Sequence, residues 1–82
     1  MREIVLDTET TGLNFRAGDR IIEVGCVELY NHISTGKTIQ FYCGVDKLIN
    51  EGATKIHGLT NDFLKNYPSF ENQVEQFLDF IK

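Results

Sequence analysis

The chain has 82 residues and a formal net charge of −4, from eight lysines and arginines against twelve aspartates and glutamates. This charge argues against a module that binds nucleic acid through a basic face. It does not exclude a nuclease, because divalent metals held by carboxylates can meet a phosphate. The sequence has no apolar run near the roughly 18 residues of a membrane span and no signal-peptide cleavage site. We therefore expect one small cytoplasmic domain without membrane contact.

The first half of the sequence predicts an antiparallel sheet of three strands. The short apolar run at residues 4–6 indicates a strand over about residues 2–8 that is buried on both faces. The β-branched content of residues 21–30 predicts the second strand, and apolar alternation predicts the third over residues 37–43. Residues 31–36, with turn chemistry in Ser34-Thr35-Gly36, separate the last two strands, which therefore form a hairpin with the first strand beside them.

The second half predicts two or three short helices. One covers residues 51–56 and ends at His57, and Thr60 is the N-cap of a second helix that Pro68 ends. Ser69 caps a third helix, whose apolar residues share one helical face: Phe70, Val74, Phe77, Leu78 and Ile81.

The third predicted helix ends at Lys82 with no strand after it. An amphipathic helix that follows a hairpin usually crosses over to a further parallel strand. We therefore expect residues 1–82 to be the N-terminal portion of a single, incomplete domain.

Cysteine and histidine are too sparse to predict a zinc site. Cys26 and Cys43 are expected to be two buried thiols of a reducing compartment. A zinc site needs more ligands at closer spacing, and His32 and His57 do not complete one. We place His32 in the hairpin turn.

Asp7 and Glu9, at the end of the first apolar strand, are the candidate catalytic residues. Residues two apart on a strand point to the same face, so both carboxylates project together. Two like charges held close repel in a dry site, and a divalent cation between them makes the arrangement favourable. Mg²⁺ is typically held by one or two carboxylates with water and phosphate oxygens, and a pair of such ions supports phosphodiester cleavage.

Each of these polar residues also has an ordinary structural explanation. An isolated Asp-x-Glu pattern is more often a solvated strand end or a loop cap, so the context decides. Thr10 and Thr11, before Gly12, either hydrogen-bond a nucleotide or form a plain turn, and the sequence leaves both open. Glu23, on the next strand, either orients a metal ligand or is satisfied by a neighbour, and we favour the second explanation.

The segment around the carboxylate pair, residues 4–13, reads IVLDTETTGL. Further stretches follow in matching order and spacing: RIIEVG at 20–25, TGKT at 35–38, IHGLT at 56–60 with Phe63-Leu64, and Pro68-x-Phe70. Across essentially all of the chain, these motifs resemble the DEDD exonucleases. Within that superfamily they resemble the family of proofreading epsilon subunits of bacterial DNA polymerase III.

This resemblance implies a partial ribonuclease H-like α/β fold, truncated before the remaining parallel strands of a mixed sheet. It implies a 3′→5′ exonuclease that removes mismatched 3′-terminal nucleotides during DNA replication, by phosphodiester hydrolysis with two Mg²⁺ or Mn²⁺ ions. The implied partners are a single-stranded DNA 3′ end and the polymerase catalytic subunit, although the tail that binds the polymerase is not among these residues.

The resemblance also implies roles for individual residues. Asp7 and Glu9 would be the first two of four acidic metal ligands. His57 would not be the catalytic base, because the base in this family is a histidine of the third motif; the second and third motifs are expected beyond Lys82. Gly52 stands where the family often has an acidic residue, which affects one nucleotide contact. The residues that would contact the terminal nucleotide are Thr8, Thr10, Thr11, Ile56 and His57.

Two alternatives remain at this point. Taken by itself, the chain would be a catalytically inactive truncated or split-gene fragment that binds metal or nucleotide weakly, because it carries half of the ligand set. The open edge of its first strand would then favour low stability or self-association. Within the superfamily, an exoribonuclease or another DNA-trimming enzyme is the other alternative, against which the cluster at residues 56–58 favours the polymerase subunit.

Overall fold

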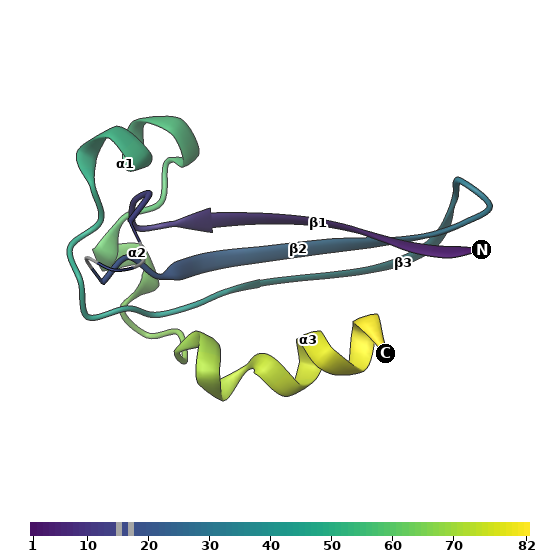
Figure 1. Ribbon diagram of the computed structural model, residues 1–82. Helices are drawn as coiled ribbons and strands as arrows, with labels where there is room; N and C mark the ends of the chain where they lie inside the picture. Colours follow the sequence, from purple (N-terminus) through teal and green to yellow (C-terminus); the bar gives the residue numbers. More distant parts are fainter. Residues whose placement is uncertain (15, 17) are drawn as a thin grey trace.

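A three-stranded antiparallel sheet followed by helices makes up the computed structural model, which describes residues 1–14, 16 and 18–82. The strand order is β1-β2-β3, as predicted (Figure 1). Among the helices that the structure describes, none has the length and apolar character to cross a bilayer. The elements are β1 (Arg2–Thr10), β2 (Ile21–Tyr30), β3 (Ile33–Tyr42), α1 (Glu51–His57), α2 (Asn61–Leu64), the 3₁₀ helix η2 (Phe70–Asn72) and α3 (Val74–Ile81).

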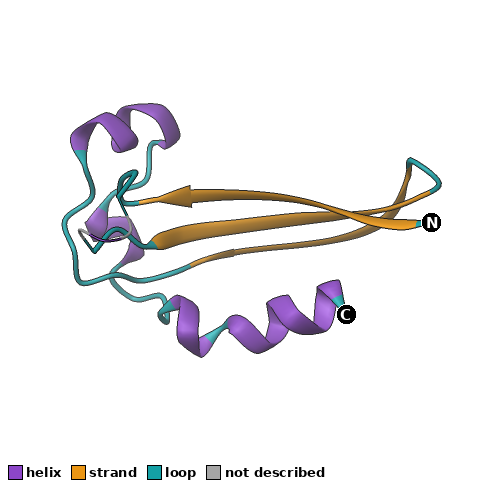
Figure 2. Cartoon of the chain, viewed as in Figure 1, coloured by secondary structure: helices purple, strands orange, loops and turns teal. Residues whose placement is uncertain are grey.

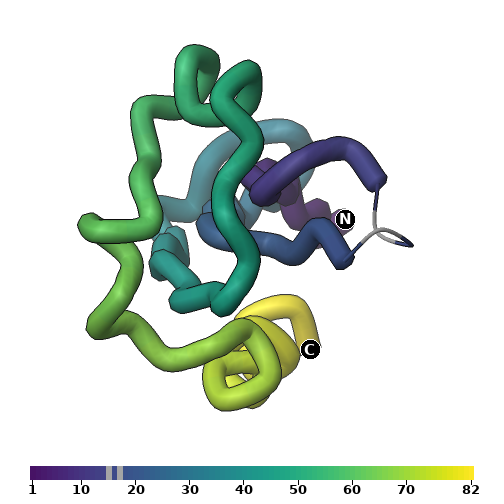
Figure 3. Tube along the Cα trace, turned by 90° about the vertical axis from the view of Figure 1, so that its left-hand side faces the viewer, coloured from purple at the N-terminus to yellow at the C-terminus, as the bar shows by residue number. Residues whose placement is uncertain are grey.

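The helices occupy two places around the sheet. Helix α3 runs along one face, whereas α1 and α2 gather at the end where β1 finishes and β2 begins (Figure 2). Viewed from that end, the segment between β3 and α3 arcs over the strand ends, and α3 lies beneath the sheet (Figure 3). The far end of the sheet carries the β2–β3 hairpin turn and the N-terminus.

The hairpin turn lies at the start of the segment predicted for it, residues 31–36. Asn31 and His32 join β2 to β3 with φ angles of 51° and 69°. Left-handed backbone at both central residues suits a two-residue turn between twisted strands, and asparagine tolerates that region well. His32 is therefore a turn residue, as predicted, but the turn chemistry of residues 34–36 does not form the hairpin turn.

Residues 34–36 instead lie inside β3, where the register with β2 shifts. Gly36 has a φ of 86°, and its N–H donates to the Ser34 hydroxyl at 3.2 Å. The Thr35 hydroxyl accepts from the Lys37 N–H, also at 3.2 Å. Side chains that bond their own backbone two residues on are typical of turns, and here the same chemistry forms an irregularity within a strand.

The prediction that the first strand is buried on both faces is also wrong. Val5 is 53% exposed and Leu6 is 52% exposed. The reason is position, because β1 lies at the edge of the sheet and pairs only with β2. Of this apolar run, Ile4 packs against the core beneath the sheet.

The core consists of two small apolar clusters. One lies between the sheet and α3, where Val24, Cys26, Phe41 and Cys43 are buried and Phe77 packs against them. The other lies at the end of the sheet and joins Ile22 of β2 to Leu59 and Leu64.

Both cysteines are buried free thiols, as predicted. Burial raises the pKa of the Cys26 thiol, and it raises the pKa of Cys43 to about 11. Both side chains therefore stay protonated and unreactive at neutral pH.

The third predicted helix is interrupted. Ser69 precedes η2 without a side-chain capping bond, and α3 begins only at Val74. Gln73 lies between them with a φ of −120°. Its side-chain amide donates to the carbonyls of Tyr42 and Pro68, each at 2.8 Å. The amide therefore ties the break in the helix to the end of β3.

This break also changes which residues face the sheet. Phe70, Phe77 and Phe80 are half-buried against the core cluster. Leu78, by contrast, is 51% exposed and Ile81 is 36% exposed, so the predicted stripe is only partly correct. Its spacing was counted through residues that the structure does not place in one continuous α-helix.

Arg2 fastens the far end of α3 to the sheet. Its guanidinium donates to the carbonyl oxygens of Phe80, Ile81 and Lys82, which are acceptors left free at a helix end. The same group pairs with Glu28 on β2 at 2.5 Å and lowers the pKa of that carboxyl. A cation at a helix C-terminus is also favoured by the helix dipole.

The two predicted short helices α1 and α2 and the Thr60 cap are confirmed, but α2 ends at Leu64, before the predicted end at Pro68. Asn50 begins α1, its side chain accepting from the N–H of Gly52 at 2.8 Å. Gly58 ends α1 with a φ of 74°, a left-handed conformation that glycine adopts without strain. The Thr60 hydroxyl caps α2 by accepting from the Phe63 N–H at 3.2 Å.

Thr11 joins the ends of β1 and β2 to the start of α1. It has no exposed surface. Its N–H donates to the Arg20 carbonyl at 2.9 Å, and its hydroxyl accepts from the Arg20 N–H at 3.0 Å. Its carbonyl accepts from the Asn50 N–H at 2.8 Å, and its hydroxyl donates to Asp19 at 2.8 Å. Because every polar atom of Thr11 is bonded, its burial costs little.

The side chain of Asp19 holds the loop that follows Thr11. Besides the Thr11 hydroxyl, the carboxylate accepts from the Lys47 ammonium at 2.8 Å and from the Asn14 N–H at 2.9 Å. Lys47 foremost, then the other two donors, lower the pKa of Asp19 to about 2. The carboxylate therefore remains charged down to strongly acidic pH.

Gly44 provides a test of the packing at the sheet end. A Cβ added there would lie 2.2 Å from the Tyr67 carbonyl oxygen and 3.2 Å from that of Leu64, both backbone atoms. We expect Gly44→Ala to lower the free energy of unfolding by about 2–3 kcal/mol, measured by urea denaturation. Gly25→Ala is the matched control, because its nearest atom lies at an ordinary 4.0 Å. Equal stabilities of the two variants would contradict this packing.

Asp19 predicts a specific pH dependence. A carboxyl whose pKa is lower in the folded state stabilises the fold above its unfolded pKa, and this stabilisation is lost as the pH falls through the folded pKa. The unfolded value is about 3.9, and the folded value is about 2. The stability difference between the natural chain and Asp19→Asn should therefore be constant above about pH 5 and should shrink toward pH 2. Urea titrations across this range measure it, with the exposed Asp46→Asn as control. A difference that persists unchanged at pH 2 would contradict the assignment.

Candidate functional site

Asp7 and Glu9 lie side by side near the end of β1, on the sheet face opposite α3. Asp7 pairs across the sheet with Gly25, and Glu9 pairs with Glu23. Ile4 packs toward α3. Because side chains alternate along a strand, Asp7 and Glu9 lie on the opposite face of the sheet from Ile4. Asp7 is exposed and Glu9 is half-buried. The strand period therefore places both carboxylates in reach of solvent and of a common ligand.

The β1–β2 ladder changes register directly after Glu9. Glu9 pairs with Glu23, but Thr10 pairs with Ile21, so Ile22 is the additional residue. Its side chain is fully buried against Leu59 and Leu64. A bulge of this kind bends the strand and redirects the side chains beside it, and here it redirects the chain just after the carboxylate pair.

Glu23 adds a third carboxylate to the same face. Like charges directly opposite each other on a sheet are destabilising, so Glu9 and Glu23 repel unless partners or a cation lie nearby. Glu23 has a partner, since the side-chain amide of Gln40 donates to it at 2.8 Å. This contact agrees with the explanation favoured from the sequence, in which a neighbour satisfies Glu23.

A cavity of about 410 Å³ opens where α1 meets the end of β1. It brings together four of the predicted site residues, from two segments more than forty positions apart in the sequence: Glu9, Thr10, Ile56 and His57. Ile56 is 84% exposed although it is apolar. Asp7 and Thr8 are exposed on the strand and do not line this cavity.

His57 connects α1 to the end of β1. Its Nδ1 accepts from the Leu59 N–H at 3.0 Å, and its Nε2 lies 3.3 Å from the Thr10 carbonyl oxygen. These contacts together fit a neutral ring that carries its proton on Nε2. The imidazole therefore has a hydrogen-bonding partner at each nitrogen and connects the end of β1 to the end of α1, two walls of the cavity.

The three threonines predicted at the site differ in accessibility. Thr8 is exposed, and Thr10 lines the cavity with its hydroxyl donating to the Gly12 carbonyl at 2.6 Å. Thr11 has no exposed surface, and its hydroxyl is bonded to Asp19 and Arg20. In this arrangement Thr11 supports the loop, and its hydroxyl is not open to a nucleotide.

Two further residues line the cavity that the sequence interpretation left out. Leu13 is fully exposed at its rim, and Asn50, the α1 cap, forms part of its wall. The position of Leu13, directly after the Thr10-Thr11-Gly12 turn, was the available signal for it. Asn50 had no such signal, because its place depends on how α1 packs against β1.

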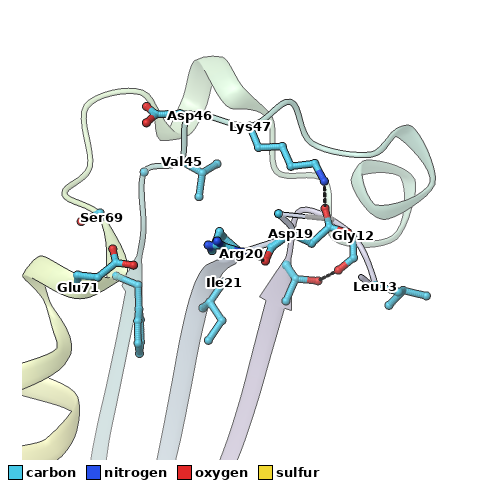
Figure 4. A pocket seen from close by; sticks show the side chains of 14 residues that line it. Gly12, Leu13, Asp19, Arg20, Ile21, Val45, Asp46, Lys47, Ser69 and Glu71 are labelled. Carbon is cyan, nitrogen blue, oxygen red and sulfur yellow. Dashed lines mark hydrogen bonds and ion pairs between the residues drawn. The ribbon is translucent and has the colours of Figure 1, made fainter. Parts of the chain in front are cut away.

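A larger cavity, of about 940 Å³, lies beside the loop that Asp19 holds, and Figure 4 shows its walls. Thr10 is the one predicted site residue among its lining residues. Lys47 reaches across it to Asp19 (Figure 4). Because neither carboxylate of the Asp7–Glu9 pair lines this cavity, we assign the candidate site to the smaller one.

The donor chemistry of the pair fits a divalent metal in part. Mg²⁺ prefers oxygen ligands and is often held by one or two carboxylates that leave places for water and phosphate. Asp7 and Glu9 offer such oxygens on one face. Within residues 1–14, 16 and 18–82, no group of three or more ligating side chains comes together. The chain thus presents two ligands, not a complete cage.

Comparison with solved structures supports the fold. The chain matches a structure of exonuclease X in complex with 5′ overhanging duplex DNA, with a TM-score of 0.77 over 90% of this chain and 42% of that one. The two are 24% identical in sequence, so this likeness shows the fold alone. It confirms the predicted ribonuclease H-like fold class.

Several relatives with closer sequences are named as the same subunit. DNA polymerase III subunit epsilon of Rickettsia felis is 44% identical over 81 residues, which are 99% of this chain and 35% of the relative. The subunit of the same name from Salmonella typhimurium is 42% identical over 85 residues, with the same shares covered. The chain thus spans about a third of these relatives, and its predicted resemblance to epsilon subunits is confirmed.

A family model provides the final comparison. The model described as RNase_T, exonuclease, matches residues 4–82. The matched region includes β1 from Ile4 onward with its two carboxylates, the cavity and the helices that the structure describes. Because it covers nearly the whole chain, the chain belongs to this exonuclease family.

Proposed function

We propose that this chain forms the first part of the catalytic site of a 3′→5′ exonuclease of the epsilon type. The observation that carries the proposal is the convergence of Glu9, Thr10, Ile56 and His57 on one cavity. This cavity lies next to a carboxylate pair at the end of a strand. The substrate in this proposal is the 3′ end of single-stranded DNA, from which mismatched terminal nucleotides are removed during replication.

Asp7 and Glu9 are the proposed metal ligands contributed by this chain. Their carboxylates project from alternate positions of β1, whose Cα atoms lie roughly 7 Å apart along the strand. Two bound Mg²⁺ or Mn²⁺ ions would supply an activated water and stabilise the leaving oxygen of the phosphodiester. Asp7 and Glu9 would bind these ions, whose positive charge would offset the repulsion between the two carboxylates.

The cavity walls are proposed to hold the terminal nucleotide. Ile56 presents an exposed apolar side chain, which suits the flat face of a base or a sugar. Leu13 presents a second one at the rim. Thr10 and His57 add polar atoms between them. The imidazole of His57 contacts the carbonyl oxygen of Thr10 and so positions Thr10. In this proposal His57 has a structural role and is not the catalytic base.

The proposed partners follow from the relatives. They are named as subunits of DNA polymerase III, and the structural neighbour was solved with DNA. We propose the same classes of partner, a DNA 3′ end and a polymerase catalytic subunit, for the protein to which these residues belong. A cytoplasmic location is part of the same proposal.

A second proposal concerns residues 1–82 taken alone. Two carboxylates at one face cannot displace enough of the hydration of two Mg²⁺ ions to hold them firmly. Glu23 on the same face is bonded to Gln40, and the described residues form no group of three ligating side chains that could hold a metal ion. We therefore propose that this segment by itself binds metal or nucleotide weakly and does not hydrolyse DNA.

Metal binding tests the ligand assignment. Mn²⁺ added to the isotopically labelled chain should broaden the NMR signals of residues near Asp7 and Glu9. The double variant Asp7→Asn/Glu9→Gln should abolish this broadening, because amides are poor ligands for hard cations. Glu75→Gln/Asp79→Asn is the matched control, making the same chemical changes on exposed positions of α3. Broadening that survives the first variant but not the second would place the metal elsewhere.

An exonuclease assay tests the proposed inactivity of the segment by itself. The purified chain is incubated with a 3′-labelled single-stranded oligonucleotide and Mg²⁺ or Mn²⁺, and circular dichroism confirms that it is folded. We expect no release of the terminal nucleotide. Release that disappears in Asp7→Ala/Glu9→Ala would overturn the inactivity of the segment and support the site. Release that persists in that variant would reveal a contaminating nuclease and leave the expectation of inactivity standing.

Ile56 tests the nucleotide cavity. Truncation of this exposed residue should change the free energy of unfolding by less than about 0.5 kcal/mol. It should weaken binding of thymidine 5′-monophosphate with Mg²⁺ by roughly fourfold to tenfold, from the loss of buried methylene groups. NMR titration measures both Ile56→Ala and its control Leu48→Ala, which is 81% exposed and lies outside the cavity lining. Equal affinities in the two variants would contradict the assignment.

A further inference from the structure

We propose that Asp19 is a positioning residue of the candidate site, although it lies outside the cavity that contains Glu9. Its carboxylate holds the loop after β1 in place. Through Thr11 it also fixes the helix that carries Ile56 and His57. This inference rests on the proposed function, because the cavity is assigned to a nucleotide there.

The first part of the argument is the number of segments that meet at one carboxylate. Oδ1 of Asp19 accepts from the Thr11 hydroxyl and from the Lys47 ammonium, each at 2.8 Å. Oδ2 accepts from the Asn14 N–H at 2.9 Å. Figure 4 shows Lys47 extending over the loop to this carboxylate. The three donors come from the end of β1, from the loop and from the segment after β3.

The second part is the close packing of Gly12 on Asp19. A Cβ added to Gly12 would lie 2.5 Å from Oδ2 of Asp19 and 2.8 Å from its Cγ. No side chain larger than hydrogen fits there without moving the carboxylate. Gly12 also lines the cavity that contains Glu9, so the carboxylate forms the back of one cavity wall.

The third part is a series of hydrogen bonds that, together with the backbone of α1, links Asp19 to the cavity. Thr11, bonded to Asp19, accepts at its carbonyl from the N–H of Asn50 at 2.8 Å. Asn50 caps the N-terminus of α1, and His57 at the other end of α1 reaches back to the Thr10 carbonyl. This series of contacts therefore ends at Thr10, the residue that follows Glu9.

This geometry predicts how the site responds when Asp19 loses its charge. A neutral amide keeps the size of the side chain but weakens the charge-assisted bond to Lys47. It also offers one acceptor oxygen in place of two. The loop and the start of α1 then loosen together, while the central strand β2 keeps its packing. Ile56 and the carboxylate pair no longer hold a fixed separation.

Amide hydrogen exchange by NMR tests the local loosening in the 82-residue chain. In Asp19→Asn, exchange at the amides of Thr11, Asn50 and Leu59 should rise by roughly tenfold relative to that of β2 amides. Lys47→Met should raise the exchange rates of the same amides by a smaller factor, because Thr11 and Asn14 still donate hydrogen bonds to Asp19. Gly12→Ala, which displaces the carboxylate without removing it, should reproduce the Asp19→Asn pattern.

A second measurement distinguishes a change in the position of Ile56 from a loss of overall stability. Mn²⁺ bound at Asp7 and Glu9 broadens the Ile56 methyl signals to an extent that falls steeply with distance. A variant that is less stable but unchanged when folded would show the broadening of the natural chain. Asp19→Asn should show reduced or heterogeneous broadening at Ile56, with the broadening beside Asp7 unchanged. Glu71→Gln, an exposed carboxyl, is the control.

The outcomes distinguish this inference from the proposed function. Exchange at Thr11, Asn50 and Leu59 that stays within about twofold of the natural chain, or that rises equally in β2, would overturn the role of Asp19. Ile56 broadening identical to that of the natural chain would also overturn it. No Mn²⁺ broadening in the natural chain would overturn the proposed function instead. The exchange pattern would then decide by itself whether Asp19 holds the loop and α1.

Discussion

The antiparallel pairing of β1 with β2 is the constraint on which the candidate site depends. Its register sets Asp7 opposite Gly25 and Glu9 opposite Glu23, and so turns both carboxylates away from the core beneath the sheet. A slip of one residue would direct them toward Val24 and Cys26, where two unpaired charges could not be buried. The hydrophobic core therefore holds the register, and the register holds the carboxylate pair at the surface.

The walls of the cavity depend on polar contacts more than on apolar packing. Ile22, Leu59 and Leu64 form a small cluster at the end of the sheet. Beyond this cluster, the loop and α1 are joined through Thr11, Asn50 and His57, each of which bonds a backbone group of another segment. A chain of this length buries a modest share of its surface, so such bonds contribute a larger part of the local rigidity than in a larger domain. Rigidity is what a site needs when it must hold a metal and a nucleotide at a set separation.

Fold and function rest here on different observations. The likeness to exonuclease X shows the arrangement of sheet and helices, at a sequence identity too low to carry over a substrate. The family match and the epsilon-subunit relatives show ancestry, over about a third of those relatives' length. The chemistry follows from Asp7, Glu9 and the cavity beside them, which is why the tests of function address these residues and not the fold.

Patterns along the chain by themselves determined the three strands, the Thr60 cap and the shared face of Asp7 and Glu9. These features arise from residues close in sequence, where a period of two or a capping hydroxyl acts locally. Tertiary structure decided the rest. Residues 31–36 carry turn chemistry in two places, and the pairing of β2 with β3 puts the turn at Asn31-His32. Thr11 became a buried support, and Val5 and Leu6 stayed exposed, because neighbours distant in sequence determine burial. Asp19 gained its role for the same reason, since Lys47 approaches it from a segment 28 positions away.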